Sequence, residues 1–266
     1  MSEEIELKLL SENEELRRRL NKLEGKNSEG IPSYSFSKIR EKELKLLFTI
    51  KKNFLDDTIF DNWFENSIKL DEGIELFLKT LIQKNIKLMS SYNEEDLKIH
   101  FLSPIFSSID FKSLKYNFRD FYEYNLTYKT EKFILNGTTD FILSTGLTTI
   151  EKPYFFIQEF KKSKEYSDPE PQLLAELISA VELNNWKTIK GAYIVGAIWN
   201  FVILEKLGKD SYQYFVSINF DSTKIEDFKT IYKNLLFVKN EIIEIAEMEK
   251  NKLNKNKGTK NESIRL

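Results

Sequence analysis

The chain has 266 residues, of which 31% are charged and 14% aromatic, and its net charge is −2. This content suffices for a folded core and excludes a disordered polyampholyte. Cysteine is absent, which excludes disulfides and thiolate metal sites, and the only histidine, His100, excludes histidine-rich metal sites. Any metal would therefore be held by oxygen ligands, which favours Mg²⁺ or Mn²⁺.

Residues 1–24 are charged throughout, unlike a secretory signal, and no later stretch has the roughly 18 apolar residues that a membrane helix needs. We therefore expect a cytoplasmic protein that does not enter a membrane. The slightly negative charge argues mildly against nucleic-acid binding, although overall charge does not exclude a local basic groove.

The first element, residues 5–24, has the spacing of a heptad seam. Its five seam residues are four, three, four and three positions apart: Leu9, Asn13, Leu16, Leu20 and Leu23. An asparagine at a core position favours a parallel dimer, so we predict a coiled-coil helix over 1–24 that forms a homodimer. The run is shorter than three heptads, so an amphipathic helix packed on its own domain is the alternative.

A linker over residues 25–37 is indicated by glycine, serine and proline. Residues 38–55 and about 57–90 have apolar side chains at three- and four-residue steps, which predicts a helical region over 38–92. This region is a candidate surface for a separate protein partner, at residues 38–90.

A further helix begins after Asn93, a favourable N-cap, with Glu94 and two more acids in its first turn. Pro104 is expected to bend it. His100 lies on this helix and is interpreted as an ordinary helix residue, because no partner for a catalytic histidine is evident.

From residue 114 the apolar pattern changes to that of strands. We predict strands over 114–128, 132–136 and 138–143, the last two joined at Asn136-Gly137, a common tight-hairpin dipeptide. Residues 154–161 are apolar on both faces until charge begins at Glu159, which indicates a central strand covered on both sides.

Beyond this strand the sequence predicts a loop, a helix, more strands and a long helix. The predicted boundaries are 162–168 for the loop, 169–186 for the helix, 191–198, 200–205 and 212–220 for the strands, about 223–250 for the last helix and 251–266 for a disordered tail. This order predicts an α/β domain over 93–250, with a mixed sheet and helices on both faces.

Asp140 and Glu159, on neighbouring strands, are candidate metal ligands, and the backbone carbonyl of Phe160 would add a third oxygen. Because strand side chains alternate, Lys161 shares a face with Glu159. It would lie beside a metal-bound water, to orient or deprotonate it or to offset charge in the transition state. These groups suit metal-assisted hydrolysis of a phosphodiester.

The segments Gly137-Thr138-Thr139-Asp140 and Glu159-Phe160-Lys161 resemble the PD-(D/E)XK nuclease superfamily, with Thr139 where members often have proline. The resemblance covers roughly residues 93–220. It implies a three-layer α/β/α restriction-endonuclease-like core with a mixed central sheet. It also implies an Mg²⁺-dependent endonuclease acting on DNA rather than RNA, with phage defence as a role.

By this resemblance Asp140 and Glu159 are metal ligands and Lys161 is the catalytic lysine. Gln172 lies on the helix after the motif strand, where many members carry a glutamine. Glu94 lies on the helix before the strands, where members often carry a glutamate that lines the site. Both are therefore expected to be auxiliary site residues.

Each of these residues also has a purely structural interpretation. Glu159 and Lys161 would form an ion pair at a strand end, and Asp140 would be a turn acid. Gln172 would be a polar residue at a helix start, and Glu94 an acid favoured by the helix dipole. Under this alternative the chain is a catalytically silent nuclease-fold scaffold or interaction module, dimerised by its coiled coil.

Overall fold

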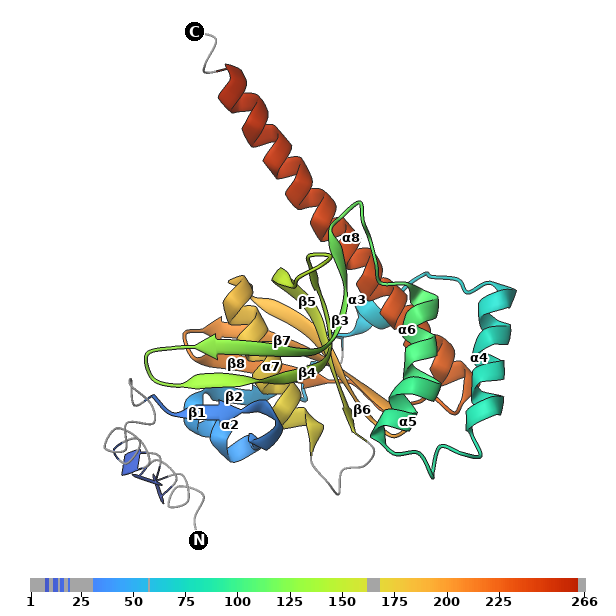
Figure 1. The fold of residues 1–266 in the computed structure, drawn as a ribbon, viewed down its shortest axis with the longest axis horizontal. Coiled ribbons are helices and arrows are strands. Elements are labelled where there is room, and N and C mark those ends of the chain that lie inside the picture. The colour runs from blue at the N-terminus through green and yellow to red at the C-terminus, as the bar shows by residue number, and fades with distance from the viewer. Residues whose placement is uncertain are drawn as a thin grey trace.

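The structure is a computed structural model that describes residues 31–56, 58–161 and 168–262, side chains as far as 248, and single residues between 8 and 19. Its elements (Figure 1) are β1 Ser33–Ser35, η1 Phe36–Lys38, α2 Glu41–Leu47, β2 Thr49–Lys52, α3 Asp61–Phe64, α4 Glu72–Asn85, α5 Glu94–Leu97, η2 Lys98–Leu102, α6 Ser103–Ile109, β3 Phe118–Lys129, β4 Ile134–Thr145, β5 Glu151–Lys161, α7 Pro169–Asn184, β6 Thr188–Val195, β7 Ile198–Gly208, β8 Ser211–Val216, β9 Phe220–Asp221 and α8 Ile225–Glu262.

The strands of the described chain form one mixed sheet. Its order is β1-β4-β5-β6-β7-β8-β2, with β3 paired to β4 and β9 to β7. The strands β3, β4 and β5 form an antiparallel meander, whereas β5 and β6 are parallel and are connected through α7. A parallel pair needs such a crossover. The predicted α/β class with a mixed sheet is confirmed.

Helices cover both faces of this sheet. Phe156 and Phe160 of β5 belong to an apolar core shared with α3, α4, α6 and α8. Ile157, between them, belongs to a second core shared with α2 and α7. Side chains of one strand alternate between faces, so β5 must be apolar on both to enter two cores, as its sequence is.

The prediction of a helix over 38–55 is wrong in its second half. Helix α2 ends at Leu47, and Thr49 begins a strand, β2, that pairs in parallel with β8. Likewise β1, inside the predicted linker, pairs in parallel with β4. Both strands are short and depend on a neighbour far along the chain, which local periodicity cannot reveal. The segment predicted as a separate helical region thus extends the same sheet.

The single helix predicted over 57–90 is two helices, α3 and α4. Residues 65–71 between them are not helical. The Asn66 side chain donates to the Trp63 carbonyl at 2.8 Å, and Asp71 accepts from the Ile74 N–H at 2.8 Å as the N-cap of α4. Asparagine and aspartate offer the backbone such local bonds in place of a continuing helix.

The predicted hairpin at Asn136-Gly137 is also wrong, because β4 runs unbroken through it. The chain reverses earlier, where Thr130 Oγ1 accepts from the Phe133 N–H at 3.0 Å. Gly137 is required for packing instead. A Cβ there would lie 2.8 Å from a ring carbon of Phe36.

The helix after Asn93 begins as predicted, with Asn93 Oδ1 accepting from the Asp96 N–H at 2.8 Å. Its second turn, Lys98–Leu102, widens into a π-helix just before Pro104, where the sequence predicts a bend. His100 lies in this turn with its ring centroid 5.6 Å from that of Tyr92.

Helix α8 continues to Glu262, so residues 251–262 are helical where a disordered tail is predicted. Extending an existing helix costs far less than nucleating one. At the other end of the chain, Leu9 and Leu16 of the predicted seam are 52% and 64% exposed, and Leu20 and Leu23 lie outside the described residues. The dimer therefore stays a prediction. Within the described ranges, no helix combines the length and apolar character needed to cross a membrane.

Candidate active site

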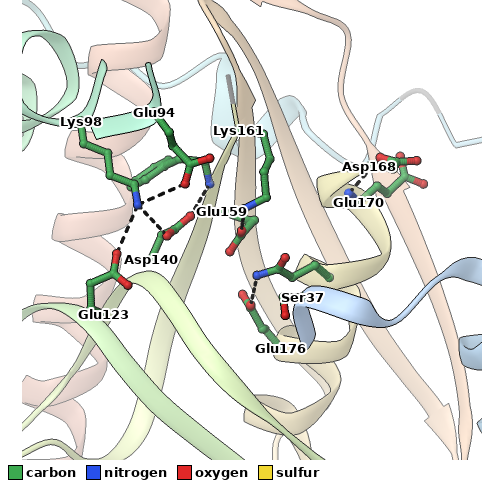
Figure 2. Close-up of polar contacts among 12 residues, drawn as sticks. Ser37, Glu94, Lys98, Glu123, Asp140, Glu159, Lys161, Asp168, Glu170 and Glu176 are labelled. Carbon is green, nitrogen blue, oxygen red and sulfur yellow. Dashed lines mark hydrogen bonds and ion pairs between the residues drawn. The ribbon is translucent and has the colours of Figure 1, made fainter. Parts of the chain in front are cut away.

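The end of β5 places Glu159 and Lys161 together. Glu159 is 1% exposed, and the Lys161 ammonium donates a hydrogen bond to its Oε1. Both side chains lie on the α7 face of the sheet, to which the neighbouring Ile157 also points. Figure 2 shows the pair near the centre of the site. Residues 162–167, which belong to the predicted loop over 162–168, lie outside the described residues.

The ladder between β4 and β5 ends beside these residues. Phe141 and Gln158 are its last pair at this end, so Asp140 and Glu159 come next without pairing. The Phe160 N–H instead donates to Asp140 Oδ2 at 2.8 Å. The Asp140 carboxylate therefore fills the opening between the two strands.

The backbone carbonyl of Phe160 faces the same opening. The Lys161 carbonyl accepts from the Gly196 N–H at 2.8 Å and so points toward β6. Because successive residues of a strand direct their backbone groups to opposite edges, the groups of Phe160 point toward β4. Asp140, Glu159 and the Phe160 carbonyl, the three predicted oxygen ligands, thus lie around one opening.

The other edge of β4 is also interrupted at Asp140. In the β3–β4 ladder the pairs skip one position, where Glu123 lies opposite Asp140. Glu123 has a φ of 48°, a left-handed conformation that is uncommon outside glycine. Such backbone strain is frequent at functional sites.

Lys98, which the sequence analysis does not single out, is the nearest cation to Asp140. Its Nζ lies 2.9 Å from Asp140 Oδ1, 3.2 Å from Glu123 and 3.4 Å from Glu94 (Figure 2). Glu95 lies 3.6 Å from the same atom. In the sequence the only signal is the Glu94–Lys98 spacing of four, which predicts merely a pair on a helix surface.

Glu94 lies at the margin of the site. It pairs with Lys98, and its charge is one of those that raise the pKa of Lys161. Its side chain is 35% exposed. Among the described residues, ion pairs connect Glu94 to Asp140 only through Lys98.

Gln172 does not contact Asp140 or Glu159 directly in the described hydrogen bonds. Its Nε2 donates to Glu176 Oε1 at 3.1 Å, one turn further along α7. Glu176 is fully buried, and the charge of Glu159 acts on it. Gln172 therefore belongs to the site through Glu176, a buried acid that the sequence analysis leaves out of its site residues.

Burial gives these groups unusual protonation equilibria. Burial, and next the charge of Asp140, raise the pKa of Glu159 well above its ordinary value, although Lys161 partly opposes this. Burial and the charge of Glu159 likewise raise the pKa of Glu176. Burial lowers the pKa of Lys161, but Glu159, Asp140 and Glu94 raise it by more. In the metal-free protein Lys161 is therefore an ammonium at neutral pH, suited to offset negative charge.

The oxygen atoms around the opening fit an Mg²⁺ or Mn²⁺ ion. Glu159 Oε2 is buried and has no hydrogen-bond partner among the described residues, a costly arrangement that a cation would relieve. In the described part of the chain, no group of three or more His, Cys, Asp or Glu side chains is arranged to hold a metal. An ion here would rely on Asp140, Glu159 and the Phe160 carbonyl, with water and substrate oxygens completing the shell, as is common for Mg²⁺.

A cavity of about 290 Å³ opens next to Asp140. Lys98, Tyr122 and Glu123 line it, and Phe106 and Phe160 belong to its apolar wall. Asp140 and Phe160 are therefore reached from a recess between the α5–α6 helices and the sheet, whereas Glu159, buried on the α7 face, does not line it.

In comparisons with known proteins, no family model and no curated protein sequence matches this chain.

Proposed function

We propose that this protein is a metal-dependent nuclease that hydrolyses phosphodiester bonds of DNA. The observation that carries the proposal is the opening between β4 and β5. Asp140 and the Phe160 carbonyl face this opening, and Glu159, which interacts with Asp140, has one buried oxygen without a hydrogen-bond partner among the described residues and its other oxygen on the Lys161 ammonium.

The resemblance to the PD-(D/E)XK nucleases supports the same function. Asp140 and the Glu159-Phe160-Lys161 segment have the residue types of that motif. Their meeting at the end of a central strand, in a mixed sheet with helices on both faces, is consistent with a restriction-endonuclease-like core. RNA is the less favoured substrate, and phage defence remains the expected role.

In this proposal Asp140, Glu159 and the Phe160 carbonyl hold Mg²⁺ or Mn²⁺, which acts as a Lewis acid and activates water. Lys161 offsets the negative charge that develops on the phosphoryl oxygens. Gln172 holds one oxygen of Glu176 by a hydrogen bond, and the charge of Glu159 acts on this buried acid. Glu94 holds Lys98 near the site.

Assembly is part of the proposal. A homodimer through residues 5–24 would present two sites related by two-fold symmetry, as a cut on both strands of a duplex requires. A protein partner at residues 38–90 would bind next to the sheet, because β2 lies in that range and pairs with β8. Partner searches should therefore use the whole chain, since deleting 1–90 removes two strands.

The decisive experiment measures cleavage of plasmid, linear duplex and single-stranded DNA with Mg²⁺, Mn²⁺ or EDTA. Glu159→Gln and Lys161→Met are each expected to lower the cleavage rate about 10²–10³-fold, the usual effect of removing one group that stabilises transition-state charge. Lys206→Met is the matched control. Like Lys161, Lys206 is a partly buried lysine on a strand, and it pairs with Glu182 near the end of α7, away from the candidate site. Equal, metal-independent activity in all variants would contradict the proposal.

A catalytically silent scaffold is the second candidate. It is favoured by the ion pairs Lys98–Asp140 and Lys161–Glu159, in which each candidate ligand already has a lysine partner. A scaffold of this kind needs no metal and gains no stability from one. Absence of both cleavage and a Mn²⁺-induced rise in melting temperature, with folded protein, would favour it.

A further inference from the structure

Lys98 has no task in the proposed reaction, yet it forms an ion pair with a candidate ligand. Its ammonium lies 2.9 Å from Asp140 Oδ1, while the Phe160 N–H donates to Oδ2 at 2.8 Å. Both oxygens of Asp140 thus have partners. The Lys98 side chain is 17% exposed, so its ammonium lies in a partly buried environment where charge interactions are strong.

Three further carboxylates lie beside Lys98. Glu123, Glu94 and Glu95 are within 3.2, 3.4 and 3.6 Å of its Nζ. Glu95 and Glu123 are 71% and 62% exposed, so they form the outer rim of the cavity. Lys98 therefore already contacts three partners that it would keep on leaving Asp140.

A divalent cation on Asp140 Oδ1 would lie within a few ångströms of this ammonium. Two like charges that close repel strongly in a partly buried site. Building on the proposed function, we infer that Lys98 competes with the metal ion for Asp140. When the ion binds, the ammonium leaves Oδ1 and moves to Glu123, Glu94 and Glu95. Lys98 is then a positioning residue that holds the Asp140 carboxylate in place before the ion arrives.

Two backbone features at this point agree with such a device. Lys98 is the first residue of the π-helical turn η2, and such turns recur at functional sites. Glu123, the nearest alternative partner, has a strained left-handed conformation opposite Asp140. Both irregularities bring charged groups to Asp140.

The test is calorimetric titration of the full chain with Mn²⁺, which needs no activity. Lys98→Met is expected to bind Mn²⁺ about tenfold more tightly than wild type, because the competing ammonium no longer reduces the binding-competent fraction. Lys98→Gln is expected to do the same and serves as a second variant if Lys98→Met does not fold. Lys206→Met, which removes a comparable lysine from Glu182, is expected to leave the affinity unchanged.

Glu123→Gln separates displacement from a general effect of charge. If Glu123 receives the displaced ammonium, Glu123→Gln weakens Mn²⁺ binding in the wild-type background and has no effect in Lys98→Met. A double-mutant cycle measures this difference. Equal weakening in both backgrounds would mean that Glu123 acts on the ion through space, and would overturn the displacement.

The failures of the two proposals are distinguishable. If wild type binds Mn²⁺ and Lys98→Met binds it equally or more weakly, the competition is overturned and the metal site stands. If wild type and both Lys98 variants, all folded by circular dichroism, show no Mn²⁺ binding, the metal site itself is overturned, and the competition with it.

Discussion

Helix α7 carries glutamates at both ends and in its middle, and their surroundings differ. Near its start, Glu170 accepts from Lys52 of β2 at 2.9 and 3.0 Å and from Tyr214 of β8 at 2.9 Å. Near its end, Glu182 accepts from Lys206 of β7 at 2.8 Å and is also bonded to the hydroxyl of a β8 tyrosine. Tyr193 of β6 also donates to Glu170, at 3.3 Å, so these two acids attach the helix to four strands, β2, β6, β7 and β8.

In the middle of the same helix, Glu176 has a different environment. Only Gln172 bonds to it, and its Oε2 has no partner among the described residues. The nearest charges include another buried acid, Glu159. A carboxylate with a complete set of partners stabilises a fold, whereas one that is buried beside a like charge costs stability. The ends of α7 are structural, and its middle borders the candidate site.

The largest expected effect on stability is at the structural end. Glu170→Ala leaves the Lys52 ammonium and the Tyr214 hydroxyl without this acceptor, and is expected to lower the free energy of unfolding by about 3 kcal/mol. Urea denaturation measures it. Glu226→Ala, at a 79% exposed glutamate of α8, is the control and is expected to change stability by less than about 0.5 kcal/mol. If Glu170→Ala lowered the free energy of unfolding no more than Glu226→Ala does, the structural role of Glu170 would be contradicted.

Metal ions are expected to stabilise the site but not the ends of α7. At a Mn²⁺ concentration of 100 times the Kd, the free energy of unfolding should rise by about 2.7 kcal/mol through ligand linkage. Glu159→Gln removes a ligand and should abolish most of this gain, whereas Lys206→Met should retain it. Thermal melts with Mn²⁺ or EDTA measure both. An equal gain in all three proteins would mean that the ion binds elsewhere.

Glu176→Gln is expected to stabilise the metal-free protein by about 1–3 kcal/mol at pH 8, because it removes a buried unpaired charge and keeps the shape of the side chain. The sign follows from linkage. Burial raises the folded pKa of Glu176 above its ordinary value of 4.5, so its favourable contribution is complete below that pH and is lost as pH rises through the folded pKa. The gain should therefore vanish near pH 4. Urea midpoints at both pH values test it, and a gain that is the same at both would contradict the buried charge.

The smallest expected effects come from removing single hydrogen bonds to Glu170. Tyr214→Phe removes a bond of 2.9 Å and should cost about 1 kcal/mol. Tyr193→Phe removes one of 3.3 Å and should cost less. Chemical denaturation of both variants gives the order, and a larger loss in Tyr193→Phe would contradict it.

How far the sequence predicted this molecule depended on how local each signal was. Asn93 begins its helix as the predicted N-cap, because an N-cap bonds within a few residues of itself. The Asn136-Gly137 hairpin failed although the dipeptide is a strong turn signal. Its glycine serves instead to admit Phe36, which is about 100 residues away along the chain.

The candidate site shows the same division. Asp140, Glu159 and Lys161 could be singled out because charge interrupts apolar strands, a pattern visible in the sequence. Lys98 and Glu176 could not, because on a helix they look like ordinary charged residues. Their importance comes from Asp140 and Glu159, which lie on strands that the fold brings beside them.

The α/β class, the central strand β5 and the charged residues at its end could be read from the amino-acid sequence, because each depends on the period of the apolar pattern or on a short motif. The folded chain was needed to reveal that β1 and β2 extend the sheet, that β4 and β5 separate at Asp140, and that Lys98 pairs with the Asp140 carboxylate. These features arise from contacts between residues far apart in the chain, whose free energy no local pattern records.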